Sequence, residues 1–243
     1  MKLVLFYLLY ISFANSQILN KPKNTPLYWL GQTNKVEEKK VFSVRFDTAW
    51  VDSLSLLLPC EGIPVPKRTS RLPNAPRKYR SGTHRGVDFF ANWGTPIRAV
   101  SKGTVIRADH NYQEYPAEYR VELLKSSARV GHTPSDIFNS VLLGKSVFLD
   151  HGFDLVPGFR AISIYAHLSS IESNLKPGAL IKAGQLIGKS GNTGTRASTL
   201  NTKKEAHLHW EMILQKGKEE IYLGQGVPNP QLYKLLYRIF DLK

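Results

Sequence analysis

The chain has 243 residues, of which 42% are hydrophobic, 21% charged and 11% aromatic, as in an ordinary globular protein with one domain and additional segments. Its single cysteine, Cys60, excludes an intrachain disulfide and a zinc site built on cysteine ligands, and we expect Cys60 to be a small buried residue. The formal net charge of +14 favours an anionic partner, such as a cell-wall polymer, a membrane surface or nucleic acid.

The first residues have the layout of a secretory signal peptide. Lys2 precedes an apolar run that ends at Phe13, and the small residues Ala14 and Ser16 occupy the positions that signal peptidase reads. The run is short for a membrane span, although a retained N-terminal anchor is an alternative. Residues 1–16 therefore predict an exported protein.

Residues 17–66 form a predicted N-terminal extension. Residues 17–40 are polar and have no clear period, whereas VFSVRF alternates and places Phe42, Val44 and Phe46 on one face of a predicted strand. The extension ends in the proline-rich turn PCEGIPVP.

From residue 82 onward, short β-rich runs such as GTVIRA, AISIYAHL and AHLHWEMIL alternate with Gly, Pro and Asn turns. This texture predicts an all-β, mostly antiparallel sandwich or barrel. Two segments interrupt it, residues 110–145, which look partly helical, and residues 195–205; such long connections are usually functional rims or covers.

The C-terminal segment 228–243 is predicted to be a short amphipathic helix. Its apolar residues recur at helical spacing after helix-starting prolines, which favours a face docked on the domain over a membrane-binding helix. These residues are Leu232, Leu235, Leu236, Ile239 and Phe240.

The stretch AHLHW places two histidines one residue apart. In a strand, His207 and His209 point to one face while Leu208 and Trp210 point to the other. Neutral imidazole is the commonest metal ligand, so this pair could form a metal or proton-transfer site. The alternative is that both are exposed histidines on a strand.

Two further segments offer partners for this pair. In GTHRGVDFF, His84 and Asp88 are four residues apart, and the adjacent glycines favour a loop that runs into a strand. In SIYAHLSS, His167 lies near the end of an apolar strand. A catalytic zinc ion keeps three protein ligands and a water, so these residues suffice for such a site. The spacing alone does not say which histidine of HxH binds the metal, and structural roles remain the alternative.

Seven motifs in order carry a resemblance to a known family. HRGVD, WGTPIRAV, GTVI, FLDHG, YAHLS, KPGALIKAGQLIGKSGNTG and HLHWE, over roughly residues 67–215, resemble the lysostaphin/LytM-type zinc peptidoglycan endopeptidases, which have the duplicated hybrid motif fold. The resemblance implies a domain at 67–227, with long loops lining a groove and insertions at 110–145 and 195–205.

The resemblance also implies site residues. One Zn²⁺ is expected on His84, Asp88 and His209, activating a water that attacks the scissile carbonyl with assistance from His167 and His207. Asn92 and Tyr165 lie near matched positions and are expected to contact substrate. A turn-stabilising role is expected for His151, and none is assigned to His110 or His132.

The implied function is an exported, zinc-dependent endopeptidase that cleaves peptide bonds in peptidoglycan stems or crosslinks, in the periplasm or at the cell wall, and that we expect to be monomeric. The basic surface is expected to face anionic wall polymers or a membrane surface. The basic run at 67–85 has few aromatic residues for base stacking, so nucleic acid is not expected.

Three other classes of protein share features with this sequence. A non-catalytic module of the same fold that activates a cell-wall amidase would usually lack the metal ligands. A biotin or lipoyl carrier needs a modifiable lysine at a hairpin tip, and neither Lys182 nor Lys189 has that setting. An efflux adaptor needs coiled-coil heptads, which the sequence does not contain.

Overall fold

The computed structural model describes residues 45–240, in which all strand pairings are antiparallel. The predicted signal peptide, residues 1–16, and most of the predicted strand over 41–46 lie outside the described residues. The described part of the extension contains the 3-10 helix η2 (Thr48–Val51) and no strand.

The largest sheet has seven strands, in the order β12-β11-β7-β6-β5-β9, with β3 paired to β11. A second sheet has the order β4-β10-β8, and β1 pairs with β2. Because β12 and β9 end the large sheet without pairing with each other, the described residues form open sheets and no closed barrel. The strands are β1 (Pro76–Arg77), β2 (Gly82–Thr83), β3 (Val87–Phe89), β4 (Pro96–Arg98), β5 (Gly103–Ala108), β6 (Val147–Asp150), β7 (Arg160–Ala166), β8 (Leu168–Ile171), β9 (Leu180–Ile181), β10 (Leu186–Ser190), β11 (Leu208–Lys216) and β12 (Glu219–Tyr222).

Strand β11 is the central element, because β7 pairs along one of its edges while β3 and β12 share the other. Its residues alternate as predicted: Leu208, Trp210 and Met212 are buried in the hydrophobic core. His209 and Glu211 therefore point to the opposite face of the sheet. The alternation separates a packed face from a polar one on the same strand.

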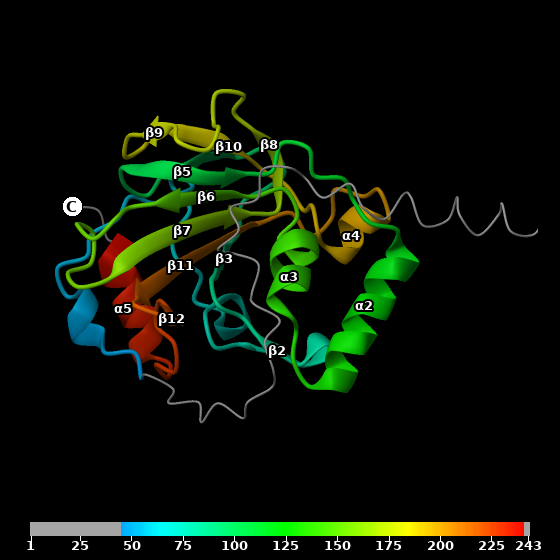
Figure 1. Cartoon of the computed structure of the whole chain (residues 1–243), viewed down its shortest axis with the longest axis horizontal. Helices are drawn as coiled ribbons and strands as arrows, with labels where there is room; N and C mark the ends of the chain where they lie inside the picture. Colours follow the sequence, from blue (N-terminus) through cyan, green and yellow to red (C-terminus); the bar gives the residue numbers. More distant parts are fainter. Residues whose placement is uncertain (1–44, 241–243) are drawn as a thin grey trace, which may run out of the picture. The chain divides into compact units, whose positions relative to one another are not determined.

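Helix α5 (Gln231–Phe240) covers the packed face, as the C-terminal pattern predicts. Its five apolar residues are buried, and the Phe240 ring meets Phe89 and Trp210 edge-on. The extension lies beside this helix, where the Leu56 amide donates to the Ile239 carbonyl (Figure 1).

The extension also supplies part of the core. Val51, Leu54 and Cys60 lie in the same hydrophobic cluster as the strands of the large sheet. Burial raises the pKa of the Cys60 thiol to about 12, so the thiol stays protonated near neutral pH. Cys60 is a small core residue, as expected.

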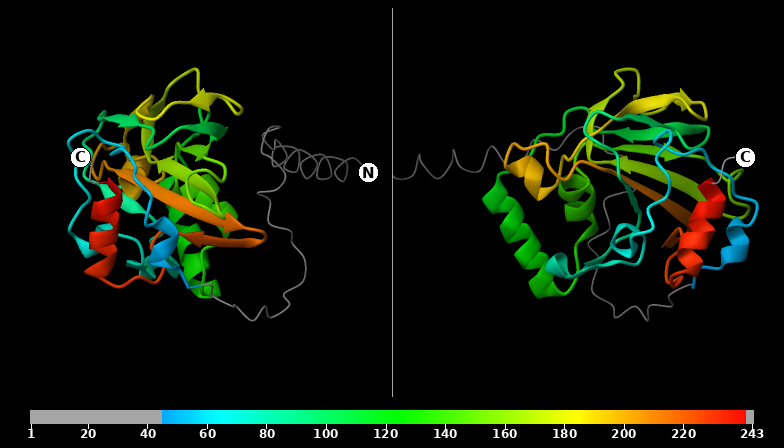
Figure 2. Two further views of the ribbon diagram at one scale, coloured as in Figure 1. Left: turned by 90° about the vertical axis from the view of Figure 1, so that its left-hand side faces the viewer. Right: turned by 180° about the vertical axis from the view of Figure 1, so that it is seen from behind.

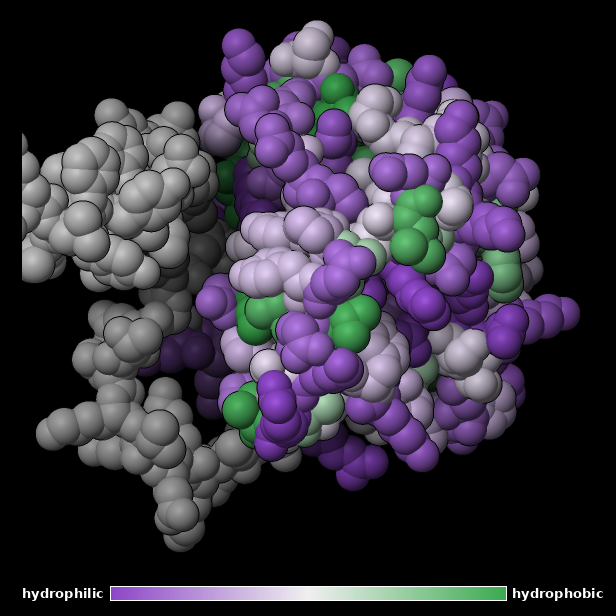
Figure 3. All heavy atoms as spheres, turned by 90° about the vertical axis from the view of Figure 1, so that its right-hand side faces the viewer, coloured by the Kyte–Doolittle hydropathy of each residue, from purple (hydrophilic) through white to green (hydrophobic). Residues whose placement is uncertain are grey.

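The two interrupting segments contain helices that lie together at the end of the sheet away from α5 (Figures 1 and 2). Residues 110–145 form α2 (Ala117–Val130), α3 (Ser135–Ile137) and the π-helix η5 (Phe138–Leu142), and residues 195–205 contain α4 (Arg196–Thr199). The part of this end formed by described residues is mostly hydrophilic, with scattered hydrophobic residues (Figure 3). The remaining short helices are η3 (Thr69–Arg71) and η4 (Lys78–Arg80).

Across residues 45–240, no helix combines the length and the apolar character that a bilayer crossing requires.

Candidate metal centre

The pairing of β3 with β11 brings the two polar motifs together. Asp88 is the direct cross-strand partner of His209, between the pairs Leu208–Phe89 and Trp210–Val87. Because the flanking pairs point into the core, Asp88 and His209 both point to the opposite face. His84 lies in the turn between β2 and β3, as its neighbouring glycines predict.

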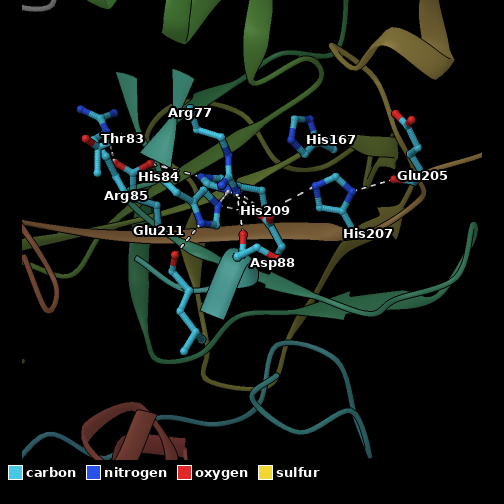
Figure 4. A network of polar contacts seen from close by, with 12 residues as sticks. Arg77, Thr83, His84, Arg85, Asp88, His167, Glu205, His207, His209 and Glu211 are labelled. Atoms are coloured by element: carbon cyan, nitrogen blue, oxygen red, sulfur yellow. Dashed lines mark hydrogen bonds and ion pairs between the residues drawn. The ribbon is translucent and has the colours of Figure 1, made fainter. Parts of the chain in front are cut away.

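Three side chains converge at this position (Figure 4). Asp88 Oδ1 lies 2.9 Å from both His84 Nε2 and His209 Nδ1, and these two nitrogens are 3.0 Å apart. All three residues are buried, with exposed fractions of 4%, 7% and 4% for His84, Asp88 and His209. Within the described residues, they form a group whose ligand atoms lie close enough to hold one metal ion.

The outer hydrogen bonds of the two rings fix which nitrogen faces inward. His84 Nδ1 lies 2.9 Å from the Leu72 carbonyl oxygen, and His209 Nε2 lies 3.3 Å from Glu211 Oε2. Both partners can only accept, so each outer nitrogen carries the proton and each neutral ring turns a lone pair inward. These two lone pairs and the Asp88 carboxylate are three acceptors that converge with no hydrogen-bond donor among them. Such an arrangement is suited to binding a cation. Two imidazole nitrogens and a carboxylate oxygen fit the donor set that zinc prefers.

Electrostatics favour an ionised carboxylate at the centre. Burial raises the pKa of Asp88, but His84, His209 and His207 outweigh burial and hold that pKa well below its usual range. Burial lowers the pKa of His209, yet the Asp88 and Glu211 carboxylates raise it overall. Burial dominates at His84 and lowers its pKa.

His167 and His207 lie beside this cluster. His167 follows the end of β7 with a positive φ of 60°, and its ring centroid lies 4.7 Å from that of His207. Each Nδ1 lies 2.7 Å from a backbone carbonyl oxygen, that of Thr193 for His167 and that of Glu205 for His207. Each Nδ1 therefore carries the proton, and each Nε2 keeps a free lone pair when the ring is neutral.

The pKa values of both rings favour the neutral form. Burial lowers the pKa of His207. Burial, together with the nearby His207 and His209, lowers that of His167 well below its usual range. Both rings therefore keep the Nε2 lone pair that a base requires.

All five residues border one cavity of about 630 Å³. Residues of the 110–145 segment form another part of its wall, including Arg120 and Leu124 of α2 and Phe138 of η5. The 195–205 segment contributes Arg196 and Glu205. Both interrupting segments thus line the cavity, as the sequence predicts.

Residues 82–221 match the model of peptidase family M23. The chain belongs to this family.

The M23 segment is also similar to named relatives. It is 28% identical to lysostaphin from Staphylococcus simulans over 139 residues, which are 57% of this chain and 20% of that protein. It is 29% identical to the glycyl-glycine endopeptidase ALE-1 from Staphylococcus capitis over 138 residues, or 57% of this chain and 26% of that protein. The matched segment therefore spans only about a fifth to a quarter of these relatives.

A comparison of structures finds the catalytic domain of lysostaphin from Staphylococcus simulans. The match covers 70% of this chain and 87% of that domain, with 24% identity and a TM-score of 0.34.

Glu211 is a buried neighbour of the candidate metal centre that was not predicted from the sequence. Its carboxylate lies 3.3 Å from His209 Nε2 and 2.9 Å from Arg85 Nε, and the residue is fully buried. The signal was present in HLHWE, because a residue two positions after His209 on a strand lies on the same face. Arg77, also missed, lies 3.3 Å from Asp88 Oδ2.

The predicted substrate contact of Tyr165 is wrong. The side chain is fully buried, and its hydroxyl accepts a 2.9 Å hydrogen bond from the Val100 amide. Alternation along β7 places it opposite Trp210 on the packed face, away from the metal centre. Asn92 is exposed on the turn after β3 but does not border the cavity, so its substrate contact remains a prediction.

The other histidines make structural contacts. His151 is buried, with Nδ1 2.6 Å from the Lys102 carbonyl oxygen and Nε2 2.8 Å from Ser163 Oγ. It joins β7 to the turn before β5, in keeping with the expected turn-stabilising role. His110 lies 2.7 Å from the Leu175 carbonyl oxygen, and His132 is exposed.

Proposed function

We propose that this chain is a zinc-dependent endopeptidase that hydrolyses peptide bonds in bacterial peptidoglycan. Membership of peptidase family M23 supports the peptidase activity. The observation that carries the metal dependence is the convergence of three acceptor atoms within about 3 Å of one another, on His84, Asp88 and His209. The layout of residues 1–16 supports action after export, in the periplasm or at the cell wall.

His84 Nε2, Asp88 Oδ1 and His209 Nδ1 would hold the zinc ion. Zinc bound there would polarise a carbonyl oxygen and lower the pKa of a coordinated water toward about 7. The chain orients its ligands through Leu72 and Glu211, which hold the outer nitrogens of the two rings. Such outer contacts set ring orientation and raise ligand basicity.

His167 and His207 would handle the protons of the reaction. Their backbone partners fix the Nδ1 protons, which leaves the Nε2 lone pairs as the available bases. One ring can take a proton as the nucleophile forms, and a protonated ring can return it to the departing amine. A protonated imidazole beside the scissile carbonyl would also stabilise the developing negative charge.

Purified zinc-loaded protein acting on isolated sacculi tests this function, with mass analysis of the released fragments. We expect peptide-bond cleavage that excess chelator abolishes, that added zinc restores and that His209→Ala lacks. His132→Ala is the matched control, because this exposed histidine lies outside the cavity. Activity that persists in chelator or in His209→Ala would overturn the proposal. Zinc binding without cleavage, together with stimulation of an amidase, would favour the non-catalytic alternative.

A further inference from the structure

Arg80 is a buried cation without an acidic partner. It is 6% exposed and borders the cavity of the metal centre. Its Nη1 donates to Thr133 Oγ1 and its Nη2 to the Thr83 carbonyl, each at 3.1 Å. Both acceptors are neutral, and within residues 45–240 no carboxylate lies at ion-pair distance from this guanidinium. Charged side chains are rarely buried without a counter-charge. We therefore expect a bound ligand to supply the negative charge that Arg80 lacks.

The surroundings of Arg80 increase that need. The neighbouring guanidinium groups of Arg77 and Arg85 are turned toward their own carboxylates, Asp88 and Glu211. Burial is the main cause that lowers the pKa of Arg80; Tyr79 opposes the shift, and Arg77 and Arg85 add to it. The face of the Phe138 ring packs against Arg80, with 5.1 Å between the guanidinium carbon and the ring centroid. An anion entering the cavity would find Arg80 held in place.

Arg120 borders the same cavity from helix α2. Its Nε donates to the Gly194 carbonyl at 3.1 Å. No carboxylate of the described chain lies at ion-pair distance from it, but Glu114 and Glu205 are close enough to raise its pKa against the effect of burial. The Tyr79 side chain lies close enough to affect the pKa of both Arg80 and Arg120, so these two guanidinium groups share a neighbour.

The charges of the cavity lining are unequal. Arg77, Arg80, Arg120, Lys125 and Arg196 border it, against two acidic residues, Asp88 and Glu205. Asp88 belongs to the candidate metal cluster, so a bound zinc ion would take up its charge. The remaining lining has five basic side chains and one acidic side chain, Glu205, and a cleft with such an excess of one sign of charge concentrates ligands of the opposite sign.

We propose that Arg80, together with Arg120, binds a free carboxylate of the peptide substrate next to the metal centre. This inference rests on the proposed function and narrows its substrate class. We expect the chain to prefer stem peptides, which carry free carboxylates, over a glycine bridge, which offers only uncharged amides. A guanidinium group binds a carboxylate through two parallel hydrogen bonds, which gives geometric selectivity as well as attraction.

A matched pair of substrates tests this proposal. Two cross-linked stem-peptide dimers share one sequence, and one of them has its free carboxylates converted to amides. We expect the zinc-loaded full chain to cleave the carboxylate form with a kcat/KM about tenfold higher, mainly through a lower KM, because a charge-assisted hydrogen bond is lost in the amide. Equal kcat/KM values for the two dimers would overturn the proposal.

Variants assign the preference to these residues. Arg80→Gln and Arg120→Gln should each bring the ratio of the two kcat/KM values toward one, and Arg80→Lys should retain part of the preference because it keeps the charge. Arg129→Gln is the control on the same helix, since Arg129 is exposed and does not border the cavity; its ratio should equal that of the wild type. The ratio is insensitive to misfolding, because loss of folded enzyme lowers both rates equally. If both glutamine variants keep the wild-type ratio, the proposal fails.

A binding measurement separates this inference from the proposed function. Fluorescence anisotropy with labelled dimers and chelator-treated protein reports affinity without turnover. We expect about tenfold tighter binding of the carboxylate dimer, and a loss of that difference in Arg80→Gln. If no dimer or sacculus is cleaved but the difference in affinity is present, the proposed function fails and the carboxylate site stands. If the dimers are cleaved and bound alike, the carboxylate site alone fails. Inorganic phosphate and free acetate can each be added as competitors of the labelled carboxylate dimer. If phosphate competes as well as acetate, the site binds anions in general, which would contradict selectivity for carboxylate.

Discussion

Asp88 and His209 are direct partners in the antiparallel pairing of β3 with β11, and Asp88 Oδ1 lies 2.9 Å from His209 Nδ1. The two residues are 121 positions apart in the chain, so the contact depends on strand register and not on local sequence. A shift of β3 by one residue against β11 would turn Asp88 into the packed face, while the pairing of β11 with β7 would keep His209 on the polar face. The same hydrophobic pairs that fix the register, Leu208 with Phe89 and Trp210 with Val87, therefore also assemble the metal centre.

Zinc should stabilise the protein through this cluster. We expect zinc added to the chelator-treated protein to raise the free energy of unfolding by about 2.7 kcal/mol when free zinc is a hundred times its dissociation constant. His84→Ala should abolish most of this increase, because one of the three convergent ligands is removed. Thermal unfolding with and without zinc measures both. An equal zinc effect in His84→Ala would show that the metal binds elsewhere.

Glu211 should set the affinity for zinc without touching it. In Glu211→Gln the hydrogen bond to His209 Nε2 can still form, but the negative charge that polarises the ring and pairs with Arg85 is lost. We expect zinc affinity to fall by about 10- to 100-fold, as measured by competition with a chromophoric chelator. Glu219→Gln is the control, because Glu219 is an exposed carboxylate on the adjacent β12. Similar affinities for the two variants would exclude this positioning role.

His167 and His207 should affect turnover more than metal binding. Replacing either with alanine is expected to lower kcat on released muropeptides by about 10²- to 10⁴-fold, the usual contribution of general acid–base catalysis. Zinc content should stay near that of the wild type, because neither residue belongs to the convergent cluster. His110→Ala, a histidine outside the cavity, provides the comparison. If kcat is retained in both variants, proton transfer must reside in other groups.

The sequence predicts the polar face of β11 and the docked face of α5 because both depend on local periodicity. Alternation in AHLHW and helical spacing in the C-terminal segment are visible within about ten residues. The resemblance to a family then adds the ligand set, which periodicity cannot supply. The sequence left open the choice between a sandwich and a barrel, because both produce the same alternation along a strand; the structure has open sheets.

Residues that lie between matched motifs were harder to assign. Tyr165 was misplaced because strand alternation would put it on the same face as His167, two residues later. His167 instead follows the end of β7 with a positive φ of 60°, which breaks the alternation. Glu211 was overlooked although the same rule places it with His209. Arg80 had no local signal, since its burial arises from packing against Phe138, which is 58 positions away. Long-range packing of this kind is absent from any short pattern.

His151 should make the folded state less stable in mild acid. Burial lowers its pKa in the folded protein below the ordinary value, although the Lys102 carbonyl and Asp150 oppose the shift. The unfolded chain therefore binds a proton more readily, so stability is complete above the unfolded pKa of about 6.5 and falls as pH decreases below it.

His151→Gln removes the titration while keeping one donor and one acceptor. Between about pH 7.5 and pH 5, the wild type should lose more unfolding free energy than the variant, as measured by urea denaturation at each pH. The comparison cancels the carboxylates that both proteins share. Parallel losses in the two proteins would mean that another group carries the pH dependence.

Helix α5 should contribute to folding through its packing on the sheet and not through the metal centre. Leu236 is fully buried in the core cluster, and its neighbour Tyr237 is 49% exposed. Leu236→Ala should lower the free energy of unfolding by about 2–5 kcal/mol, because it removes buried methyl groups and leaves a cavity. Tyr237→Ala, one position along the same helix, should change it by about 0.5 kcal/mol or less. Since α5 covers the face opposite His209, zinc affinity of the folded Leu236→Ala protein should equal that of the wild type; a parallel loss of zinc affinity would show that the packed and polar faces of β11 are coupled.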